Sequence, residues 1–175
     1  MKRVIGVLST GLLAGVMLFG ASSPQAYAES SSKPYQIVTP GVNGEQATIG
    51  FDKKSDFENF LTTHPVPKNF KIQPLAQIYS TFYYDNDLKG SSFIVNASRN
   101  PVIIVNFGGS NNDNVSSVLT HSFGDYTTIY EHTNAQGHAL AIVNNGGYIN
   151  LTSFSLGDGA RTWNDEASSA IVKSN

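Results

Sequence analysis

The amino-acid sequence predicts an all-β fold, an antiparallel sandwich or barrel, over about residues 78–173. Three observations support this prediction. Short runs rich in Val, Ile, Phe and Tyr alternate with clusters of Gly, Asn and Asp, and no helical period separates them. Charged residues make up only 14% of the chain, which disfavours long exposed helices. Two sequence patterns also recur in the same order, which indicates an internal duplication.

The first 28 residues have the three parts of a secretory signal peptide. A basic pair precedes an apolar stretch from Val4 to Gly20, and Ala26-Tyr27-Ala28 supplies small residues for cleavage. Ser, Thr and Gly residues dilute the apolar stretch, which argues against a membrane anchor. We therefore expect a secreted, extracellular protein that has no membrane association once the peptide is cleaved after Ala28.

Residues 29–77 are expected to form an N-terminal extension with one short helix. The segment from Glu29 to Pro40 is Ser-rich and has no period, which predicts a flexible lead-in. Ser55-Asp56-Phe57-Glu58 matches a capping box, and it predicts a helix over about residues 55–64 whose one apolar face must dock elsewhere. Three prolines after this helix predict an extended linker to about Ile78.

The C-terminal part of the chain contains seven predicted strands. Each is a short apolar run bounded by turn-forming residues. The predicted strands are 78–84, 91–96, 102–106, 126–131, 138–143, 147–151 and 169–172.

This part of the chain carries two patterns, and each occurs twice. Residues 82–90 align with residues 129–137 at an offset of 47, and each copy is a strand end, a polar turn and a glycine. Residues 112–117 align with residues 164–169 at an offset of 52, because the connection before the second copy is five residues longer. We infer a duplicated unit of four strands.

The two patterns resemble those of the βγ-crystallin domain in its calcium-binding, microbial form. An aromatic hairpin ends in Gly90 or Gly137, and a loop of the form (N/D)(N/D)xx(S/T)S follows each hairpin. The resemblance implies two Greek-key motifs packed as a sandwich. Leu88 and Ala135 stand where the family usually has an aromatic residue, and Tyr84 stands where it often has an acidic one.

The two loops offer hard oxygen donors, which are the ligands that calcium prefers. The four histidines show no ligand spacing with a third donor, so zinc is disfavoured. The resemblance implies that each aspartate side chain serves the site built mainly by the other loop. The implied ligands of Ca2+ are the side chains of Asp113 and Asp165, the hydroxyls of Ser116 and Ser168, the carbonyls of Asn114 and Glu166, and a hairpin carbonyl from Tyr84 or Glu131.

Two points about these loops stay open at this stage. The sequence does not decide which hairpin serves which loop. Both loops are also compatible with Asx-turns that bind no ion. Ser117 and Ser169 are expected to hold the loops over the hairpins.

The expected function is that of a secreted calcium-binding protein whose fold Ca2+ stabilises. The chain has no cysteine, which excludes disulfides, and a net charge of −2, which offers no basic surface for nucleic acid. Nucleophile and phosphate-loop motifs are missing, so we expect no enzyme. The alternative is a secreted metalloprotease inhibitor, or an antimicrobial or toxin-like protein, on the same fold. The domain is expected to be monomeric or weakly associating, and no protein partner is predicted.

Overall fold

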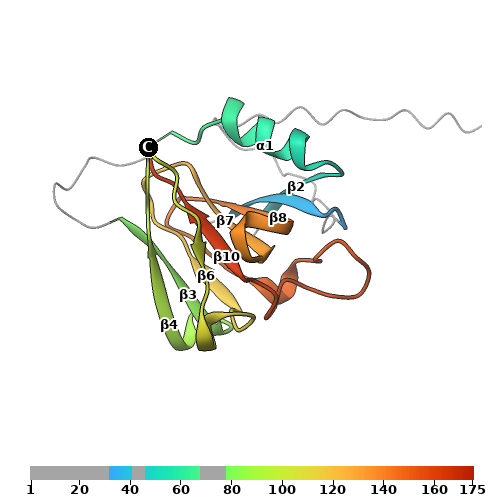
Figure 1. Ribbon diagram of the computed structural model, residues 1–175, viewed down its shortest axis with the longest axis vertical. Helices are drawn as coiled ribbons and strands as arrows, with labels where there is room; N and C mark the ends of the chain where they lie inside the picture. Colours follow the sequence, from blue (N-terminus) through green and yellow to red (C-terminus); the bar gives the residue numbers. More distant parts are fainter. Residues whose placement is uncertain (1–31, 41–45, 68–77) are drawn as a thin grey trace, which may run out of the picture.

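The computed structural model describes residues 32–40, 46–67 and 78–175 of the chain. The predicted signal peptide and most of the linker before Ile78 lie outside these residues. The described chain forms two β-sheets that enclose a common core, and one short helix lies over the larger sheet (Figure 1). Within the described residues, no helix has the length and apolar character needed to span a membrane.

The described residues form ten strands, one α-helix and three short 3-10 turns. The N-terminal elements are β1 (Tyr35–Pro40), β2 (Gln46–Phe51) and α1 (Lys54–Thr63). The first copy of the duplication contains β3 (Tyr79–Asp85), β4 (Lys89–Asn96), β5 (Val105–Asn106), η1 (Gly109–Asn111) and β6 (Ser117–Leu119). The second copy contains β7 (Tyr126–His132), η2 (Thr133–Ala135), β8 (Gln136–Val143), β9 (Tyr148–Asn150), η3 (Leu151–Ser153) and β10 (Ser169–Val172).

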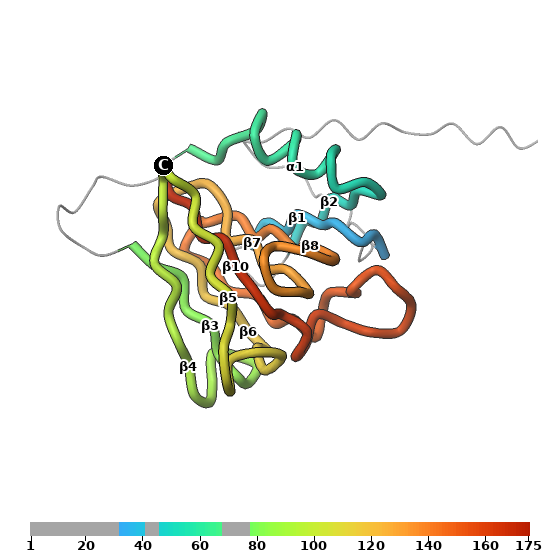
Figure 2. Tube along the Cα trace, viewed as in Figure 1, coloured from blue at the N-terminus to red at the C-terminus, as the bar shows by residue number. Residues whose placement is uncertain are grey.

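The two copies exchange one strand each. The smaller sheet has the order β4-β3-β6-β9, and the larger has the order β2-β1-β8-β7-β10-β5. The third strand of each copy, β5 or β9, therefore pairs with the last strand of the other copy. Figure 2 shows β5 beside β10. This arrangement confirms the predicted all-β sandwich of two Greek-key motifs.

The main core lies between the two sheets. Successive residues of a strand point to opposite faces of the sheet, and along β7 and β8 both faces are buried, one by this core and the other by a second hydrophobic cluster that includes Phe57 of α1. Ile129 of β7 and Leu140 of β8 are direct neighbours in register, and both are fully buried. Phe82 of β3 and Trp163, the only tryptophan, belong to the same cluster. The two copies thus share one hydrophobic core.

The N-terminal segment is more ordered than the sequence predicts. The expected flexible lead-in is wrong for Tyr35–Pro40, because this segment forms β1, which pairs in parallel with β8. Strand β2 then pairs with β1 and extends the larger sheet. The buried Ile37 and Val38 explain why β1 is held in place. Only two aliphatic residues, Ile37 and Val38, follow Tyr35 in this segment, so the run is too short to stand out as a strand pattern.

The helix forms close to its predicted position but without the predicted cap. It begins at Lys54 after the N-cap residue Lys53, which makes no side-chain capping bond, so the expected capping box at Ser55 is wrong. The expected docking of its apolar face is observed. Phe57 is fully buried, and Phe60 packs with it against the second hydrophobic cluster on the outer face of the larger sheet.

Other strand predictions differ from the structure in detail. The predicted strand 102–106 is reduced to β5, and Val102, Ile103 and Ile104 are exposed. Strand β6 is not predicted, because only Ser117–Leu119 pair and polar residues, Ser116 and Thr120, flank this short run.

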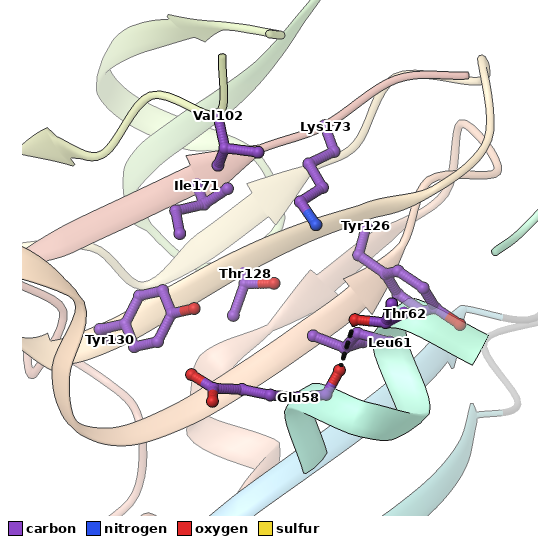
Figure 3. A pocket seen from close by; sticks show the side chains of 9 residues that line it. All are labelled: Glu58, Leu61, Thr62, Val102, Tyr126, Thr128, Tyr130, Ile171 and Lys173. Carbon is purple, nitrogen blue, oxygen red and sulfur yellow. Dashed lines mark hydrogen bonds between the residues drawn. The ribbon is translucent and has the colours of Figure 1, made fainter. Parts of the chain in front are cut away.

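A cavity of about 180 Å³ lies between α1 and the outer face of β7 and β10 (Figure 3). Burial is the main cause that raises the pKa of both Tyr126 and Tyr130 to about 12, so both phenols stay neutral at physiological pH. The Tyr126 hydroxyl donates to the His64 carbonyl at 2.8 Å. Tyr126 therefore attaches the end of the helix to the sheet, and the Lys54 ammonium of α1 lies 5.9 Å from the centroid of the Tyr130 ring.

The buried His121 links the β6–β7 loop to the C-terminal strand. Its Nε2 lies 2.8 Å from the Lys173 carbonyl and must donate to it, while Nδ1 accepts from the Phe123 N–H at 3.1 Å. Burial lowers the pKa of His121 to about 4. A second ring proton would point at the Phe123 N–H, so the neutral ring is the form that fits the fold.

We predict that this histidine makes the fold less stable in acid. Because the folded pKa is below the unfolded value of about 6.5, the contribution is complete above pH 6.5 and is lost as the pH falls toward 4. The loss is at most about 3 kcal/mol. Urea unfolding in chelator at several pH values measures this loss for the wild type and for His121→Gln. If the free energies of unfolding of the two proteins differ by the same amount at every pH, the prediction is wrong.

We also predict that the helix belongs to the cooperative folding unit. Phe57→Ala is expected to lower the free energy of unfolding by about 3–5 kcal/mol, because it removes a fully buried ring. Ile94→Ala on the exposed face of β4 serves as a control and should change it by less than about 0.5 kcal/mol. Urea denaturation compares the two, and equal small effects would show that the helix unfolds on its own.

Candidate functional site

The two duplicated loops adopt the same local conformation. Asp113 and Asp165 both have positive φ angles, of 50° and 57°. The preceding asparagine in each loop donates from its side-chain amide to the Oδ2 of the aspartate, at 2.5 Å from Asn112 and 2.7 Å from Asn164. Asn and Asp tolerate this left-handed backbone better than most residues. The repeated (N/D)(N/D) pair thus orients one carboxylate in each loop.

The two loops lie side by side and bind each other through their backbones. The Asp113 N–H donates to the Ala167 carbonyl at 3.1 Å, and the Asp165 N–H donates to the Val115 carbonyl at 3.0 Å. Loops separated by about fifty positions in the chain are therefore neighbours in space.

Each aspartate side chain reaches the serine of the opposite loop. The Ser168 hydroxyl lies 2.9 Å from the Oδ1 of Asp113, and the Ser116 hydroxyl lies 3.4 Å from the Oδ1 of Asp165. Both serines are buried. The structure thus produces two clusters of oxygen atoms, and each contains side chains from both copies.

Backbone contacts assign one hairpin to each loop, which the sequence leaves open. The Ser116 N–H donates to the Tyr83 carbonyl at 2.8 Å, so this loop lies against the β3–β4 hairpin that carries Tyr84. The Ser168 N–H donates to the Tyr130 carbonyl at 2.9 Å, so the second loop lies against the β7–β8 hairpin that carries Glu131.

The remaining candidate residues turn their side chains away from the two clusters. The Tyr84 hydroxyl donates to Asn111, and the Asn114 amide donates to the Ser110 carbonyl at 3.1 Å. The Glu131 and Glu166 carboxylates both bind Arg161. The side chains of all four residues thus have other partners. Only their backbone carbonyls are left as ligands for Ca2+, which is the role that the resemblance implies.

Ser117 and Ser169 tie the loops to the hairpins in the same way. The Ser117 hydroxyl donates to the Asp85 carbonyl at 2.7 Å and accepts from the Leu88 N–H at 3.2 Å. The Ser169 hydroxyl donates to the His132 carbonyl at 2.6 Å and accepts from the Ala135 N–H at 3.2 Å. The expectation that both serines hold the loops over the hairpins is confirmed.

Two asparagines that the sequence analysis did not select complete the hairpins. Asn150 of β9 binds Asp87 in the first hairpin, and Asn106 of β5 binds Asn134 in the second, each as both donor and acceptor. Because β5 and β9 have exchanged sheets, each hairpin is held by a residue of the other copy. The signal available in the sequence was the recurring pair of an aliphatic residue and Asn, at 105–106 and 149–150.

The hairpin glycines have a steric role. Gly90 and Gly137 both have positive φ angles. A Cβ atom at Gly90 would lie 2.4 Å from the Asp85 carboxylate, and one at Gly137 would lie 3.0 Å from the Glu131 carboxylate. Glycine therefore lets both hairpins fold back beneath the loops.

The donor set of each cluster suits a hard cation. Each combines a carboxylate oxygen with a hydroxyl oxygen, and both are ligand types that Ca2+ accepts. Within the described residues, no group of three or more His, Cys, Asp or Glu side chains is arranged to hold a metal. A cation at these loops would therefore depend mainly on neutral oxygen donors.

Comparisons with known proteins give one match. No protein-family model and no curated protein matches the sequence. A solved structure described as "Evolution of the eye lens beta-gamma-crystallin domain fold" is similar to this chain with 23% sequence identity and a TM-score of 0.45. The similarity covers 63% of this chain and 98% of that chain. It concerns the arrangement of the strands and gives no ligand.

We predict that Ser117→Ala and Ser169→Ala each lower the free energy of unfolding by about 1–3 kcal/mol, measured in chelator. Each change leaves a carbonyl and an N–H without their partner beneath the loop. Ser92→Ala on the exposed side of β4 is the matched control. Urea midpoints equal to that of the control would contradict the structural role of these hydroxyls.

Proposed function

We propose that the protein is a secreted calcium-binding protein in which two Ca2+ ions stabilise the fold. The observation that carries this proposal is the reciprocal approach of Asp113 to Ser168 and of Asp165 to Ser116. Turn formation alone does not require the aspartate of one loop to approach the serine of the other, yet this contact occurs twice at equivalent places. Secretion rests on the signal-peptide pattern of residues 1–28.

The proposal assigns a separate ligand set to each ion. The first site takes the Ser116 hydroxyl, the Asp165 side chain and the carbonyls of Asn114 and Tyr84. The second takes the Ser168 hydroxyl, the Asp113 side chain and the carbonyls of Glu166 and Glu131. The assignment of hairpins follows the backbone contacts of Ser116 and Ser168.

The distances within each oxygen pair support calcium. Adjacent ligands in a Ca2+ shell with bonds of about 2.4 Å lie about 3 Å from each other. The carboxylate and hydroxyl oxygens are 2.9 Å apart in one cluster and 3.4 Å apart in the other. Magnesium fits less well, because it usually keeps several water ligands and binds to few protein groups.

The proposed role of the ions is to connect the two copies of the duplicated unit. The chain has no cysteine, so no disulfide can do this. With one aspartate per site, affinities on the order of 10⁻⁵ to 10⁻³ M are expected, as in extracellular modules. At ten times the dissociation constant, each ion adds about 1.4 kcal/mol to the stability of the folded protein.

Calorimetric titration of the mature chain with calcium tests the proposal. We expect two binding events and a higher melting temperature with calcium than with chelator. Trp163 is buried directly before the second loop, so its fluorescence gives an independent signal. A titration without heat or fluorescence change, together with identical melts, would reject calcium binding.

Pairs of substitutions test the crossed ligand sets. Asp165→Ala with Ser116→Ala removes ligands of one proposed site, so one binding event is expected to remain. Asp113→Ala with Ser116→Ala affects both proposed sites, so binding is expected to be lost or greatly weakened. Asp56→Asn, an exposed change on α1, is the control. Equal residual binding in the two double variants would show that the ligands are not crossed.

A further inference from the structure

The longer connection of the second copy brings the positively charged side chain of Arg161 to the second loop. Residues 155–162 form a loop that projects from the sandwich, seen as the orange-red segment in Figures 1 and 2. A β-bridge joins Ser155 to Thr162, and the Leu156 N–H donates to the Arg161 carbonyl at 2.9 Å. This loop contains the extra residues that make the second copy longer than the first.

The N-terminal strand holds this loop in position. The buried Gln36 of β1 donates from its side-chain amide to the Ser155 carbonyl at 2.7 Å. Gly157 lies so close to the backbone of Lys33 that a Cβ atom there would come within 2.7 Å of it. The position of Arg161 is therefore supported by packing at the base of its loop.

Arg161 binds both glutamates that belong to the second proposed site. Its Nη2 lies 3.1 Å from the Oε1 of Glu131, and its Nη1 lies 3.0 Å from the Oε2 of Glu166. Its Nε donates to Asp158 at 2.8 Å. The Glu131 side chain is only 11% exposed, so its charge needs a nearby partner. One guanidinium thus joins the hairpin residue and the loop residue whose carbonyls are proposed ligands.

The first proposed site has neutral residues at the same positions. Tyr84 corresponds to Glu131, and Asn114 corresponds to Glu166. Their side chains make neutral hydrogen bonds to residues of η1. The two sites therefore have similar ligand atoms but differ in the charges that surround them.

We propose that Arg161 acts as an internal counter-cation of the second calcium site. It holds Glu131 and Glu166 together when calcium is absent, and it weakens calcium binding there. The inference rests on the proposed function above. It predicts that the second site binds calcium more weakly with Arg161 than without it, and that the second loop depends less on calcium for its stability.

The physical reason is the linkage between the two cations. Without Arg161, the two carboxylates repel each other across the loop, and a bound Ca2+ would relieve this repulsion. With Arg161, most of the repulsion is already removed, and the positive charge of Arg161 also opposes the ion. If an interaction stabilises the calcium-free form relative to the calcium-bound form by some factor, it lowers the calcium affinity by that factor.

The test uses Arg161→Gln in a protein with a single functional site. In the Asp165→Ala background, only the second proposed site remains. Arg161→Gln is then expected to raise its calcium affinity on the order of fivefold at low salt. In the Asp113→Ala background, where only the first proposed site remains, the same change should alter the affinity less than about twofold. Arg99→Gln is the control, because the Arg99 side chain contacts Ser174 near the C-terminus and not the loops.

Thermal melts provide a second measurement that does not depend on the titration. Arg161→Gln is expected to lower the melting temperature in chelator more than in saturating calcium. An equal loss in both conditions would show that Arg161 is only a structural link, and an unchanged or lower affinity would also overturn the inference. A wild type that binds no calcium would overturn the proposed function as well, so the two failures are distinguishable.

Discussion

The structure depends on a reciprocal exchange between two copies of one unit. Each copy gives its third strand to the sheet of the other, and the asparagine on that strand holds the other copy's hairpin. Each copy also extends an aspartate toward a serine of the other. Since neither copy completes its own hairpin or loop, the two must fold together around one core. Any ion at these loops would strengthen contacts that the fold already makes.

The exchange is symmetric, but the rest of the chain is not. Strands β1 and β2 add to the larger sheet beside β8, and no strand of the described part of the chain pairs with the free edge of β4. The residues that precede the duplication therefore favour one copy, and Gln36 extends this support to the loop that carries Arg161. The added loop brings Arg161 to Glu131 and Glu166 at the second proposed site, whereas the corresponding residues of the first, Tyr84 and Asn114, are neutral. A duplicated ligand pattern therefore does not imply two equal sites.

Neutral hydrogen bonds from buried side chains help to hold both copies. Ser117, Ser169 and His121 are buried, and each satisfies backbone groups of a neighbouring segment. Buried backbone groups without such partners would cost free energy, so these three residues have a structural role that does not depend on any bound ion.

The sequence by itself determined the all-β class, the duplication, the docked helix and the residues of the two loops, because these follow from local patterns and from their repetition. It missed β1, β2 and β6, whose short runs become strands only beside β8, β1 and β3. The tertiary structure alone decided which hairpin serves which loop, and it alone brought Arg161 to Glu131 and Glu166. These are contacts between distant segments, and their existence depends on how the strands cross between sheets. No local pattern in the chain contains that information.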